Sequence, residues 1–540
     1  MDQVFSFNDS FINDINYFAP LGKSDHVSIK IELKVNNSIE FLSSMKQNWY
    51  KIDSDFVLTH SKNVDWNYSN DRLDVECMWS ESHTKLTSIC DSVPTITLKT
   101  TRDGHVLERL PWDCSMLIRK RKHKDRSWRS FESNPSLVTY SNAMFQQQQY
   151  QKAEVKAKVK FENKLVKNLK SNSKPFFKYL KSKNKVNKSV SGINCSDGSS
   201  TVTPKDTADA LADFFESVFT IEPYGPLPRQ CYQRYTDVNM DMDSVTVDHS
   251  TVIDLLKNLD CGKAMGPDNI HPKLLKYFAD DLSFVKAISE LFNKCIAQEC
   301  IPTDWKSAVV IPLHKKGSVH SANNYRPVSL TCIVCKMYEK LLRQPLLEHV
   351  SHCINVNQHG FTKGKSCLSN LLETIDTVND YLSEGNCADI LYFDFSKAFD
   401  SVPHHRLVTK LANYGIPESM LNIIRDFLTD RTMVIKVGDA LSSTRNVSSG
   451  VPQGSVLGPL LFLLFINDIP EGIRNMIKIF ADNVKLVANP LEYDFVIEDL
   501  EALSSWEQLW QLTFNLEKCK VMYLGSENPH TRYVLSLIHI

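Results

Sequence analysis

The sequence predicts an α+β fold, in which short strands and amphipathic helices are mixed along the chain. Two mainly apolar runs, 390–393 and 477–481, have the length of strands, and each is followed directly by an aspartate. Residues 496–509 instead repeat apolar side chains every three or four positions, which is typical of a helix that covers a sheet. The chain has 540 residues, of which 42% are hydrophobic and 23% charged, so it is long enough for several structural units with buried cores.

Composition and hydropathy exclude several classes of protein. Residues 1–7 show neither a basic start nor an apolar stretch, so the sequence predicts no secretory signal. The longest apolar run, 456–466, is interrupted by Gly458 and Pro459 and is shorter than the roughly 18 residues that cross a bilayer. We therefore expect an intracellular protein, in the nucleus or the cytoplasm, with no membrane partner and with its 14 cysteines reduced.

The N-terminal third is strand-like at first and then strongly basic. Residues 26–33 alternate as a strand does, whereas residues 40–190 are mostly helical in pattern. Between Arg119 and Lys188 there are about 20 Lys/Arg against about 4 Asp/Glu, in a chain whose net charge is −1. Apolar residues within 152–180 predict an amphipathic helix with a cationic outer face. Charge alone leaves two interpretations open, which are a phosphate-binding surface and a solvated helix without a partner.

A basic β-hairpin is predicted between residues 308 and 330. The apolar strand 308–313 is followed by Lys315 and Lys316, and the next strand carries Arg326. Because arginine offers a planar fork that matches phosphate oxygens, this hairpin could hold a triphosphate. The alternative is ordinary surface charge.

Asp394 is the first candidate metal ligand. It ends a strand that is apolar on both faces, as expected in the middle of a covered sheet. A carboxylate beside an apolar wall is costly unless a cation accompanies it, so we expect Asp394 to bind magnesium with the help of the carbonyl oxygen of Phe395.

Five residues further on, the ring of Phe399 could lie under a sugar and collide with a 2′-hydroxyl group. The alternative role of Phe399 is packing of a helix on the sheet.

Residues 450–459 form a Gly/Pro-rich segment that opens a predicted helix, 460–467. Small residues at a helix start, Gly454 among them, let a base pair approach the backbone closely, and Gln453 could contact a nucleotide or a template strand. A simple bend from strand to helix is the alternative.

The second carboxylate lies in a predicted hairpin, 477–487, whose two turn residues are Asp482 and Asn483. Asparagine tolerates the positive φ that such a turn needs. Its amide oxygen can bind magnesium but brings no charge, and at about 4 Å a unit charge is worth on the order of 4 kcal/mol in an effective dielectric near 20. Since about 1.4 kcal/mol is a tenfold change in rate, even part of this loss predicts catalysis slowed by about one to three decades.

Lys518 is a candidate general acid. It lies between the predicted helix 496–509 and a predicted strand, 521–524. Its ammonium group could protonate a leaving pyrophosphate, or it could be an exposed loop lysine.

Taken in order, these segments resemble the reverse transcriptase of non-long-terminal-repeat retrotransposons of the jockey and chicken-repeat-one type. The matching motifs are Gly266–Asp268, Tyr325–Leu330, Asp394–Asp400 with Val402–His404, Gly450–Gly458, Phe480–Asp482, and Asn515 with Lys518–Cys519. The resemblance implies a right-hand polymerase with fingers, palm and thumb. It also implies dependence on Mg²⁺ and extension of a DNA primer on an RNA template from deoxynucleoside triphosphates.

The resemblance assigns roles to individual residues. Asp394 and Asp482 receive the metal-ligand role, Phe399 the role of sugar gate, and Arg326 and Gln453 contacts to the nucleotide. The family has an aspartate where this chain has Asn483, so the third acidic role has no residue to carry it. Residues 204–380 are expected to form an N-terminal extension and the fingers, and residues 381–525 the palm.

The two ends of the chain are also interpreted through this resemblance. Asp25 and His26 resemble the end of the apurinic-type endonuclease domain of these elements, but the metal-binding acids of that domain do not accompany them, which predicts no cleavage activity. We expect residues 1–35 to be an endonuclease remnant, 36–203 a basic nucleic-acid-binding or linker region, and 526–540 a truncated tail. A catalytically inactive relic that at most binds nucleic acid is the alternative to an active polymerase.

Overall fold

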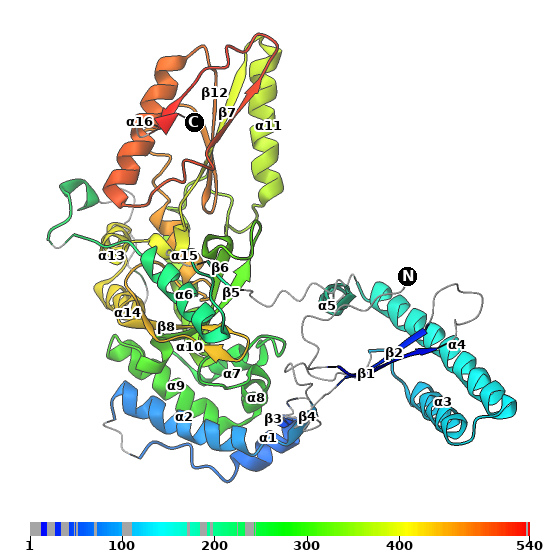
Figure 1. The fold of residues 1–540 in the computed structure, drawn as a ribbon. Coiled ribbons are helices and arrows are strands. Elements are labelled where there is room, and N and C mark those ends of the chain that lie inside the picture. The colour runs from blue at the N-terminus through cyan, green and yellow to red at the C-terminus, as the bar shows by residue number, and fades with distance from the viewer. Residues whose placement is uncertain are drawn as a thin grey trace. The chain divides into compact units, whose positions relative to one another are not determined.

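The chain folds into two units, each a mixture of helices and strands (Figure 1). One unit comprises Met1–Asn48 and Pro94–Val186, and the other comprises Trp49–Val93 and Asn187–Ile540. The α+β class is thus confirmed, while the region predicted as one stretch, 36–203, is divided between the units. The computed structural model describes residues 12–18, 28–33, 43–47, 49, 52–69, 73–99, 111–169, 173–183, 192–194, 198–223, 225–232, 242, 245–535 and 538–539.

The first unit contains two antiparallel strand pairs and a pair of packed helices. The strand pairs are β1 (Ile12–Phe18) with β2 (Ser28–Leu33) and β3 (Ser43–Gln47) with β4 (Thr95–Lys99). The helices are α3 (Ser115–Ser133) and α4 (Leu137–Lys167), followed by α5 (Lys174–Lys183). Asp25 and His26 lie outside the described residues.

The amphipathic helix predicted over 152–180 is in fact two helices, α4 and α5. Tyr150 and Ala153 of α4 are buried with Leu117 of α3. Further along α4, Val155 and Val159 are 62% and 48% exposed. The apolar side of α4 is therefore only partly covered, since Ala157 packs on this cluster whereas Val155 and Val159 do not.

A helical layer with an aromatic centre forms one part of the second unit. Its helices are α1 (Ser54–Ser61), α2 (Val75–Asp91), α7 (His249–Lys257), α8 (Pro272–Tyr277), η4 (Phe278–Asp280), α9 (Leu282–Ala297), η5 (Thr303–Lys306) and α10 (Ile333–Val350). Trp79, Phe292, Trp305 and Tyr338 are buried together, with ring centroids 5.3–6.2 Å apart. Burial of such large rings supplies much of the free energy that holds these helices together.

A five-stranded sheet carries the predicted basic hairpin. Its strands are β5 (Ser307–His314), β6 (Tyr325–Leu330), β8 (Arg431–Val437), β9 (Ala440–Leu441) and β10 (Arg445–Val447). β5 and β6 are antiparallel, with Leu313 opposite Arg326, whereas β5 and β8 are parallel. The predicted strand 308–313 is confirmed, and α6 (Pro204–Ser217) packs on β8.

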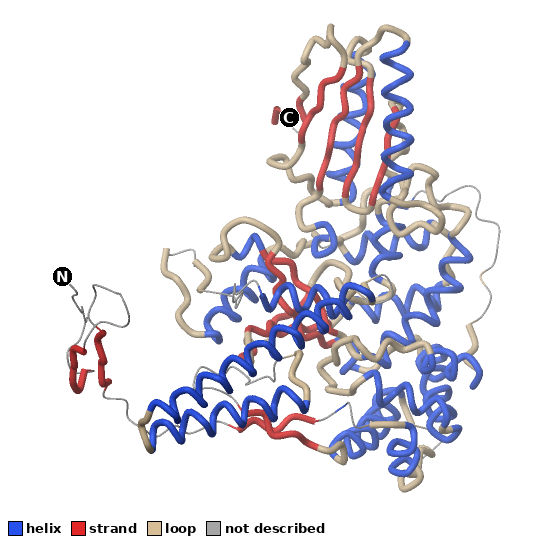
Figure 2. The backbone as a smooth tube through the Cα atoms, turned by 90° about the vertical axis from the view of Figure 1, so that its right-hand side faces the viewer, coloured by secondary structure: helices blue, strands red, loops and turns tan. Residues whose placement is uncertain are grey.

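A four-stranded antiparallel sheet holds both predicted metal ligands. The strand order is β11 (Met476–Phe480), β12 (Asn483–Ala488), β7 (Ala388–Asp394) and β13 (Lys520–Leu524). Ile390 packs on Val378 of α11 (Cys367–Ser383), and Leu391 packs in the core that includes Leu500 of α16 (Tyr493–Trp510). The two helices therefore cover opposite faces, which confirms that β7 is apolar on both sides (Figure 2).

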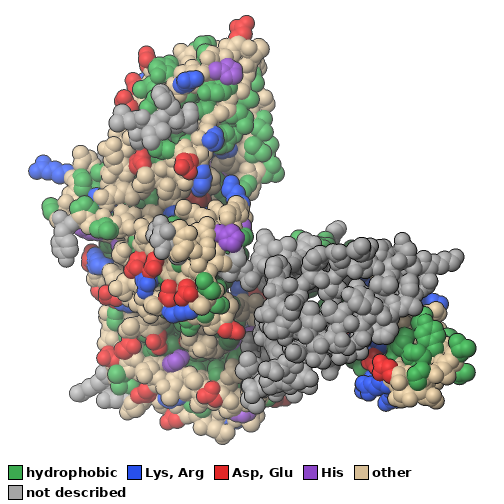
Figure 3. Space-filling model, in the orientation of Figure 1, with side chains coloured by type: hydrophobic (Ala, Val, Ile, Leu, Met, Phe, Trp, Pro, Cys, Tyr) green, Lys and Arg blue, Asp and Glu red, His purple; other side chains and the backbone are tan. Residues whose placement is uncertain are grey.

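The outer side of α11 is apolar and exposed. Leucine and isoleucine side chains gather there (Figure 3), namely Leu368, Leu371, Leu372, Ile375 and Leu382. Their helical spacing forms one stripe, and no described residue covers it fully. Among the described residues, the buried apolar contact of α11 is made by the side that faces the sheet, through Val378.

The remaining elements of the second unit are short. They are η3 (Arg229–Tyr232), η6 (Ala322–Asn324), α12 (Ala398–Ser401), α13 (His404–Asn413), α14 (Glu418–Leu428), α15 (Gly458–Phe465), β14 (Val534–Leu535) and β15 (Ile538–His539). The helix predicted at 460–467 thus begins two residues earlier, at Gly458. Among the helices of the described residues, none is both long enough and apolar enough to cross a membrane.

Candidate active site

Neighbouring strands bring the two predicted carboxylates together. Asp394 is the last residue of β7, and in the sheet register it lies directly opposite Asn483, the first residue of β12. Asp482 precedes Asn483 in the turn between β11 and β12. Two acidic residues far apart in the sequence thus lie at adjoining strand ends.

The turn itself differs from the prediction by one residue. Phe480 pairs with Asn483, so the two turn residues are Ala481 and Asp482. Ala481, and not Asn483, has positive φ, at 52°. The expectation that Asn483 supplies the left-handed residue was wrong because Asn483 already belongs to the β12 ladder, where extended backbone is required.

The backbone after Asp394 is held by the segment that follows α16. The amide of Asn515 donates to the carbonyl of Asp394 at 2.6 Å, and the amide of Ser396 donates to Thr513 at 2.9 Å. Between these bonds the ring of Phe395 stacks on Phe514, with centroids 4.5 Å apart. The carbonyl of Phe395 is therefore carried by a rigid backbone next to Asp394.

Each carboxylate has a polar partner. The ammonium of Lys518 donates to Asp394 Oδ2 at 2.5 Å, which brings this predicted general acid to the site. The side-chain amide of Asn483 donates through Nδ2 to Asp482 Oδ1 at 3.1 Å. An aspartate at position 483 could not donate in this way, so the substitution changes both the charge and the hydrogen bonding of Asp482.

Lys315 of the basic hairpin lies within electrostatic reach of the two carboxylates. Desolvation lowers the pKa of Lys315, and the nearby charges of Arg326 and Lys518 lower this pKa further. The negative charges of Asp482 and Asp394 oppose that shift, so Lys315 lies in the field of both cations and carboxylates. Lys315 thus lies within electrostatic reach of two further cations, Arg326 and Lys518, and of both carboxylates. Such a group of cations favours phosphate oxygens.

The ring of Phe399 is fixed by α15. It stacks on Phe462 with centroids 4.4 Å apart and meets Phe361 edge-on at 6.3 Å. Phe399 is half-buried, so part of the ring stays open. It lines a small pocket together with Gln453 and Ser329.

Gln453 is oriented by Asp400, a residue to which the sequence had assigned no role. The amide nitrogen of Gln453 donates to both carboxylate oxygens of Asp400, at 2.9 and 3.0 Å. Burial raises the pKa of Asp400 to about 6, and the hydrogen bonds from Gln453 oppose this rise. With its nitrogen engaged, Gln453 keeps its carbonyl oxygen as the acceptor for a ligand.

The predicted close approach at Gly454 is made to the protein itself. Gly454 has φ of +135°, and a Cβ atom there would lie 2.3 Å from the carbonyl oxygen of Ser329 in β6. The Ser329 amide donates to the carbonyl of Gln453 at 2.8 Å. The structural reason for glycine at 454 is thus contact with the backbone of β6, whereas the sequence had suggested contact with a base pair.

A buried glutamate that the sequence did not single out holds the start of α15. The carboxylate of Glu339 in α10 accepts the amides of Val456 and Leu457, at 2.5 and 2.9 Å. Burial raises the pKa of Glu339, and these two amides oppose the shift. No local signal could identify Glu339, because in the sequence it is one acidic residue in an ordinary helix.

The donor atoms at the strand ends fit a hard divalent cation. Two carboxylates and a backbone carbonyl are oxygen ligands of the kind that magnesium prefers. The described residues contain no cluster of three His, Cys, Asp or Glu side chains that could hold a metal. At the strand ends the third side chain is the amide of Asn483, which lies opposite Asp394 in the sheet register.

Comparisons with known proteins agree with this geometry. Residues 313–535 match the family model described as reverse transcriptase (RNA-dependent DNA polymerase). The chain is 25% identical to the probable RNA-directed DNA polymerase from transposon BS of Drosophila melanogaster, over 60% of this chain and 38% of that protein. It is 27% identical to the RNA-directed DNA polymerase from mobile element jockey of the same organism, over 59% of this chain and 36% of that protein.

The chain therefore spans a little over a third of the length of these relatives. Among solved structures, an apo telomerase from Candida tropicalis has 12% identity and a TM-score of 0.33, covering 50% of this chain and 67% of that one. The family match and the relatives identify residues 313–535 as a reverse transcriptase domain of the jockey-like, non-long-terminal-repeat type.

Proposed function

We propose that this chain is an RNA-directed DNA polymerase, which extends a DNA primer on an RNA template by phosphoryl transfer assisted by two Mg²⁺ ions. The observation that carries the proposal is the meeting of Asp394 and Asp482 at adjoining strand ends, within a group of cations. In this proposal the four-stranded sheet, within 381–525, is the palm. The hairpin of β5 and β6 belongs to the fingers, within 204–380.

The reaction joins the primer to an incoming deoxynucleotide. The 3′-hydroxyl of the primer loses its proton to water, its oxygen forms a bond to the α-phosphorus, the bond from that phosphorus to the bridging oxygen breaks, and pyrophosphate leaves. Magnesium held by Asp394, Asp482 and the Phe395 carbonyl would make the hydroxyl more acidic and neutralise phosphate charge. Lys518, which pairs with Asp394, would give a proton to the departing pyrophosphate.

Other residues select and orient the nucleotide. Arg326 and Lys315 would bind the triphosphate, because Lys315 lies within electrostatic reach of both Arg326 and the two carboxylates. The half-open ring of Phe399 would exclude a 2′-hydroxyl, since stacking on Phe462 prevents it from yielding. Gln453 and Gly454 would contact the nucleotide or the template through the segment that leads into α15.

The test compares primer extension by the chain as it stands with extension by Asn483→Asp. Restoring the carboxylate is expected to raise kcat by about 10- to 1000-fold, because it returns a unit of negative charge to the metal site. Asp394→Asn in the Asn483→Asp background is the matched control and should abolish extension. If no variant extends a primer, the polymerase proposal is wrong; if Asn483→Asp is no faster than the unaltered chain, the charge argument is wrong.

An inactive relic is the second candidate function. It is favoured by the hydrogen bond from Asn483 to Asp482, which occupies a carboxylate oxygen needed by a metal ion. Binding of nucleic acid without extension, even after Asn483→Asp, would select this candidate. The proposal that residues 1–35 are an endonuclease remnant rests on the resemblance alone, and nicking of a plasmid that contains abasic sites would contradict it.

A further inference from the structure

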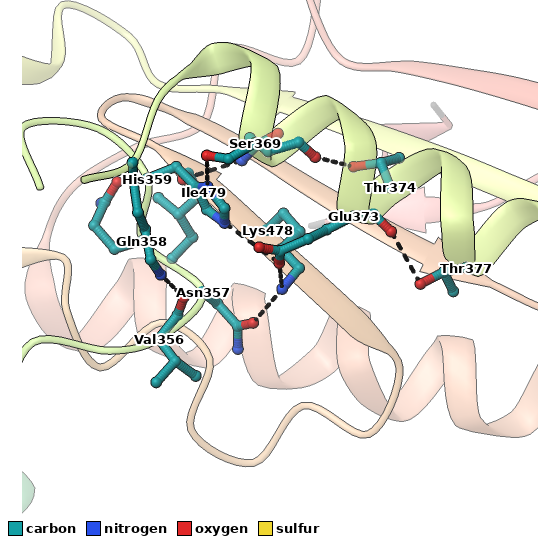
Figure 4. Close-up of polar contacts among 12 residues, drawn as sticks. Val356, Asn357, Gln358, His359, Ser369, Glu373, Thr374, Thr377, Lys478 and Ile479 are labelled. Carbon is teal, nitrogen blue, oxygen red and sulfur yellow. Dashed lines mark hydrogen bonds and ion pairs between the residues drawn. The ribbon is translucent and has the colours of Figure 1, made fainter.

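A segment before α11 extends the edge of the four-stranded sheet. Gln358 forms a parallel bridge with Ile479 of β11. The amide of Ile479 donates to the carbonyl of Asn357 at 2.9 Å, and the amide of His359 donates to the carbonyl of Ile479 at 2.8 Å. Figure 4 shows this segment beside β11 and below the first turns of α11. The strand that leads to Asp482 is thus held from its outer side.

The side chain of Gln358 reaches the turn itself. It is 1% exposed, and its carbonyl oxygen accepts the amide of Ala481 at 3.2 Å and the amide of Gly360 at 2.7 Å. A Cβ atom at Gly360 would lie 2.4 Å from the nitrogen of Ala481, so glycine permits this contact. The side-chain oxygen of Gln358 therefore holds the turn, at Ala481, to its own segment, at Gly360.

This turn needs outside support. Ala481 has φ of +52°, a left-handed conformation that residues with a Cβ atom rarely adopt unless their surroundings fix it. Ala481 is buried, so its amide would lack a hydrogen-bond acceptor if Gln358 lost its oxygen. The expected result is relaxation of the turn and displacement of Asp482 relative to Asp394.

A layer of charged and polar groups supports the segment. Lys478 of β11 donates to Asn357 Oδ1 at 2.9 Å and pairs with Glu373 of α11 at 2.5 Å. The ring of His359 lies 2.8 Å from the hydroxyl of Ser369 and 3.5 Å from the carboxylate of Glu373. The hydrogen bond from Lys478 lowers the pKa of Glu373, although burial opposes this shift. These contacts join α11, the segment and β11 into one rigid unit (Figure 4).

We propose that Gln358 is a positioning residue for catalysis, which fixes the Ala481–Asp482 turn so that Asp482 faces Asp394. The inference rests on the proposed polymerase function for its catalytic consequence, and on geometry alone for its structural part. Gln358 acts through the backbone of Ala481 and does not touch the reacting atoms. The loss of its acceptor should therefore affect use of the metal and the chemical step more than binding of the nucleotide.

Two substitutions separate the acceptor from the shape of the side chain. Gln358→Met keeps the length and removes the oxygen, whereas Gln358→Glu keeps an oxygen that can accept both amides. The Gln358 nitrogen has no hydrogen-bond partner among the described residues, so Gln358→Glu breaks no existing bond. Thr377→Val is the matched control, because among the described residues its hydroxyl bonds only to the carbonyl of Glu373 within α11.

Primer extension on RNA is measured in the Asn483→Asp background. Gln358→Met should lower kcat by about 10- to 100-fold, as expected for displacement of a reacting group by a fraction of an ångström to about 1 Å. It should raise the Mg²⁺ concentration that gives half-maximal rate and leave the KM for deoxynucleotide within about threefold. Gln358→Glu should recover most of kcat, and Thr377→Val should match its parent. Equal kcat in Gln358→Met and its parent would overturn the inference.

Hydrogen–deuterium exchange of the full chain gives a result that does not depend on activity. Peptides that cover residues 476–488 should exchange faster in Gln358→Met than in Gln358→Glu or Thr377→Val. If no variant extends a primer, the polymerase proposal fails, and exchange alone decides whether Gln358 holds the turn. Unchanged exchange in Gln358→Met would overturn that structural part as well.

Discussion

At position 483 this chain has an asparagine where the family it resembles has an aspartate, and this difference alters the contacts of both carboxylates at the candidate active site. The amide donates to Asp482 at 3.1 Å, while Asp394 opposite is paired with Lys518. In each case a partner supplied by the protein takes the place that a metal ion would use. Local packing is undisturbed, since Asn483 continues the β12 ladder opposite Phe480. The chain can thus keep its fold while its chemistry is weakened.

Asp400 introduces a pH dependence at the residue scale. Its pKa is raised to about 6 by burial, so its carboxylate is charged above that pH and accepts both bonds from Gln453. Below pH 6 protonation removes one acceptor and loosens Gln453. In the Asn483→Asp background we expect the KM for deoxynucleotide to rise about three- to tenfold between pH 7 and pH 5, the range that one hydrogen bond accounts for.

Steady-state kinetics across this pH range check the prediction. Asp400→Asn is the control, because its side-chain oxygen does not titrate and its KM should vary little with pH. A KM that stays constant from pH 7 to pH 5 in the parent would show that Asp400 does not govern Gln453.

At the scale of elements, a buried ion pair joins α13 to the segment after α15. Lys410 is fully buried, and its ammonium donates to Asp468 at 2.7 Å and to the carbonyl of Phe465 at 2.6 Å. The ring of Trp510 lies 3.4 Å from the ammonium, and Trp506 donates to Asp468 at 2.8 Å. Burial lowers the pKa of Lys410 to about 8 despite the attraction of Asp468.

Removal of one partner of the Lys410–Asp468 pair should therefore lower the free energy of unfolding more than removal of both partners. Lys410→Met leaves the Asp468 charge buried, and we expect it to lower the free energy of unfolding by about 3–5 kcal/mol. Adding Asp468→Asn should restore part of this loss. Equilibrium unfolding in urea, followed by tryptophan fluorescence, measures both variants.

The exposed pair of Arg425 and Glu418, at 3.4 Å, provides the control. Arg425→Ala should change the free energy of unfolding by less than about 1 kcal/mol, because water screens such pairs. Equal effects of Lys410→Met and Arg425→Ala would refute the argument from burial.

At the scale of the whole molecule, positive charge is concentrated in the helices of the first unit. α3 carries seven Lys/Arg, α4 six and α5 four, against two, two and no acidic residues. Lys156, Lys160 and Lys164 are exposed and recur every four residues, so they share one side of α4. We propose that this surface binds nucleic acid through phosphate contacts.

Such binding should weaken steeply as salt rises. For single-stranded RNA, each phosphate contact adds about 0.7 to the slope of log affinity against log salt, so changing Lys156, Lys160 and Lys164 to glutamine should reduce the slope by about 2. Fluorescence anisotropy of a labelled RNA over a salt series measures this slope. Lys257, Lys286 and Lys340, exposed on helices of the second unit, form the control triple and should leave the slope unchanged. A slope near zero for the unaltered chain would contradict phosphate binding.

Much of the local structure could be predicted from the sequence. The apolar run before Asp394 is a two-sided strand, and the strand 308–313 is present as predicted, because both depend on short-range hydrophobic patterning. The turn at Ala481 and Asp482 could not be predicted. Its position is set by the register of β11 with β12 and by the acceptor on Gln358, which no local preference for asparagine can outweigh.

The sequence by itself determined the class of the fold, the motifs of the reverse transcriptase domain and the absence of a third carboxylate at position 483. These follow from residue identity and from patterns a few positions long. Only the tertiary structure decided which residues support the site, because Glu339, Gln358 and Asp400 act through contacts with segments distant in sequence. Such contacts depend on how the chain packs, and a buried polar residue gives no sign of its partner until the two segments meet.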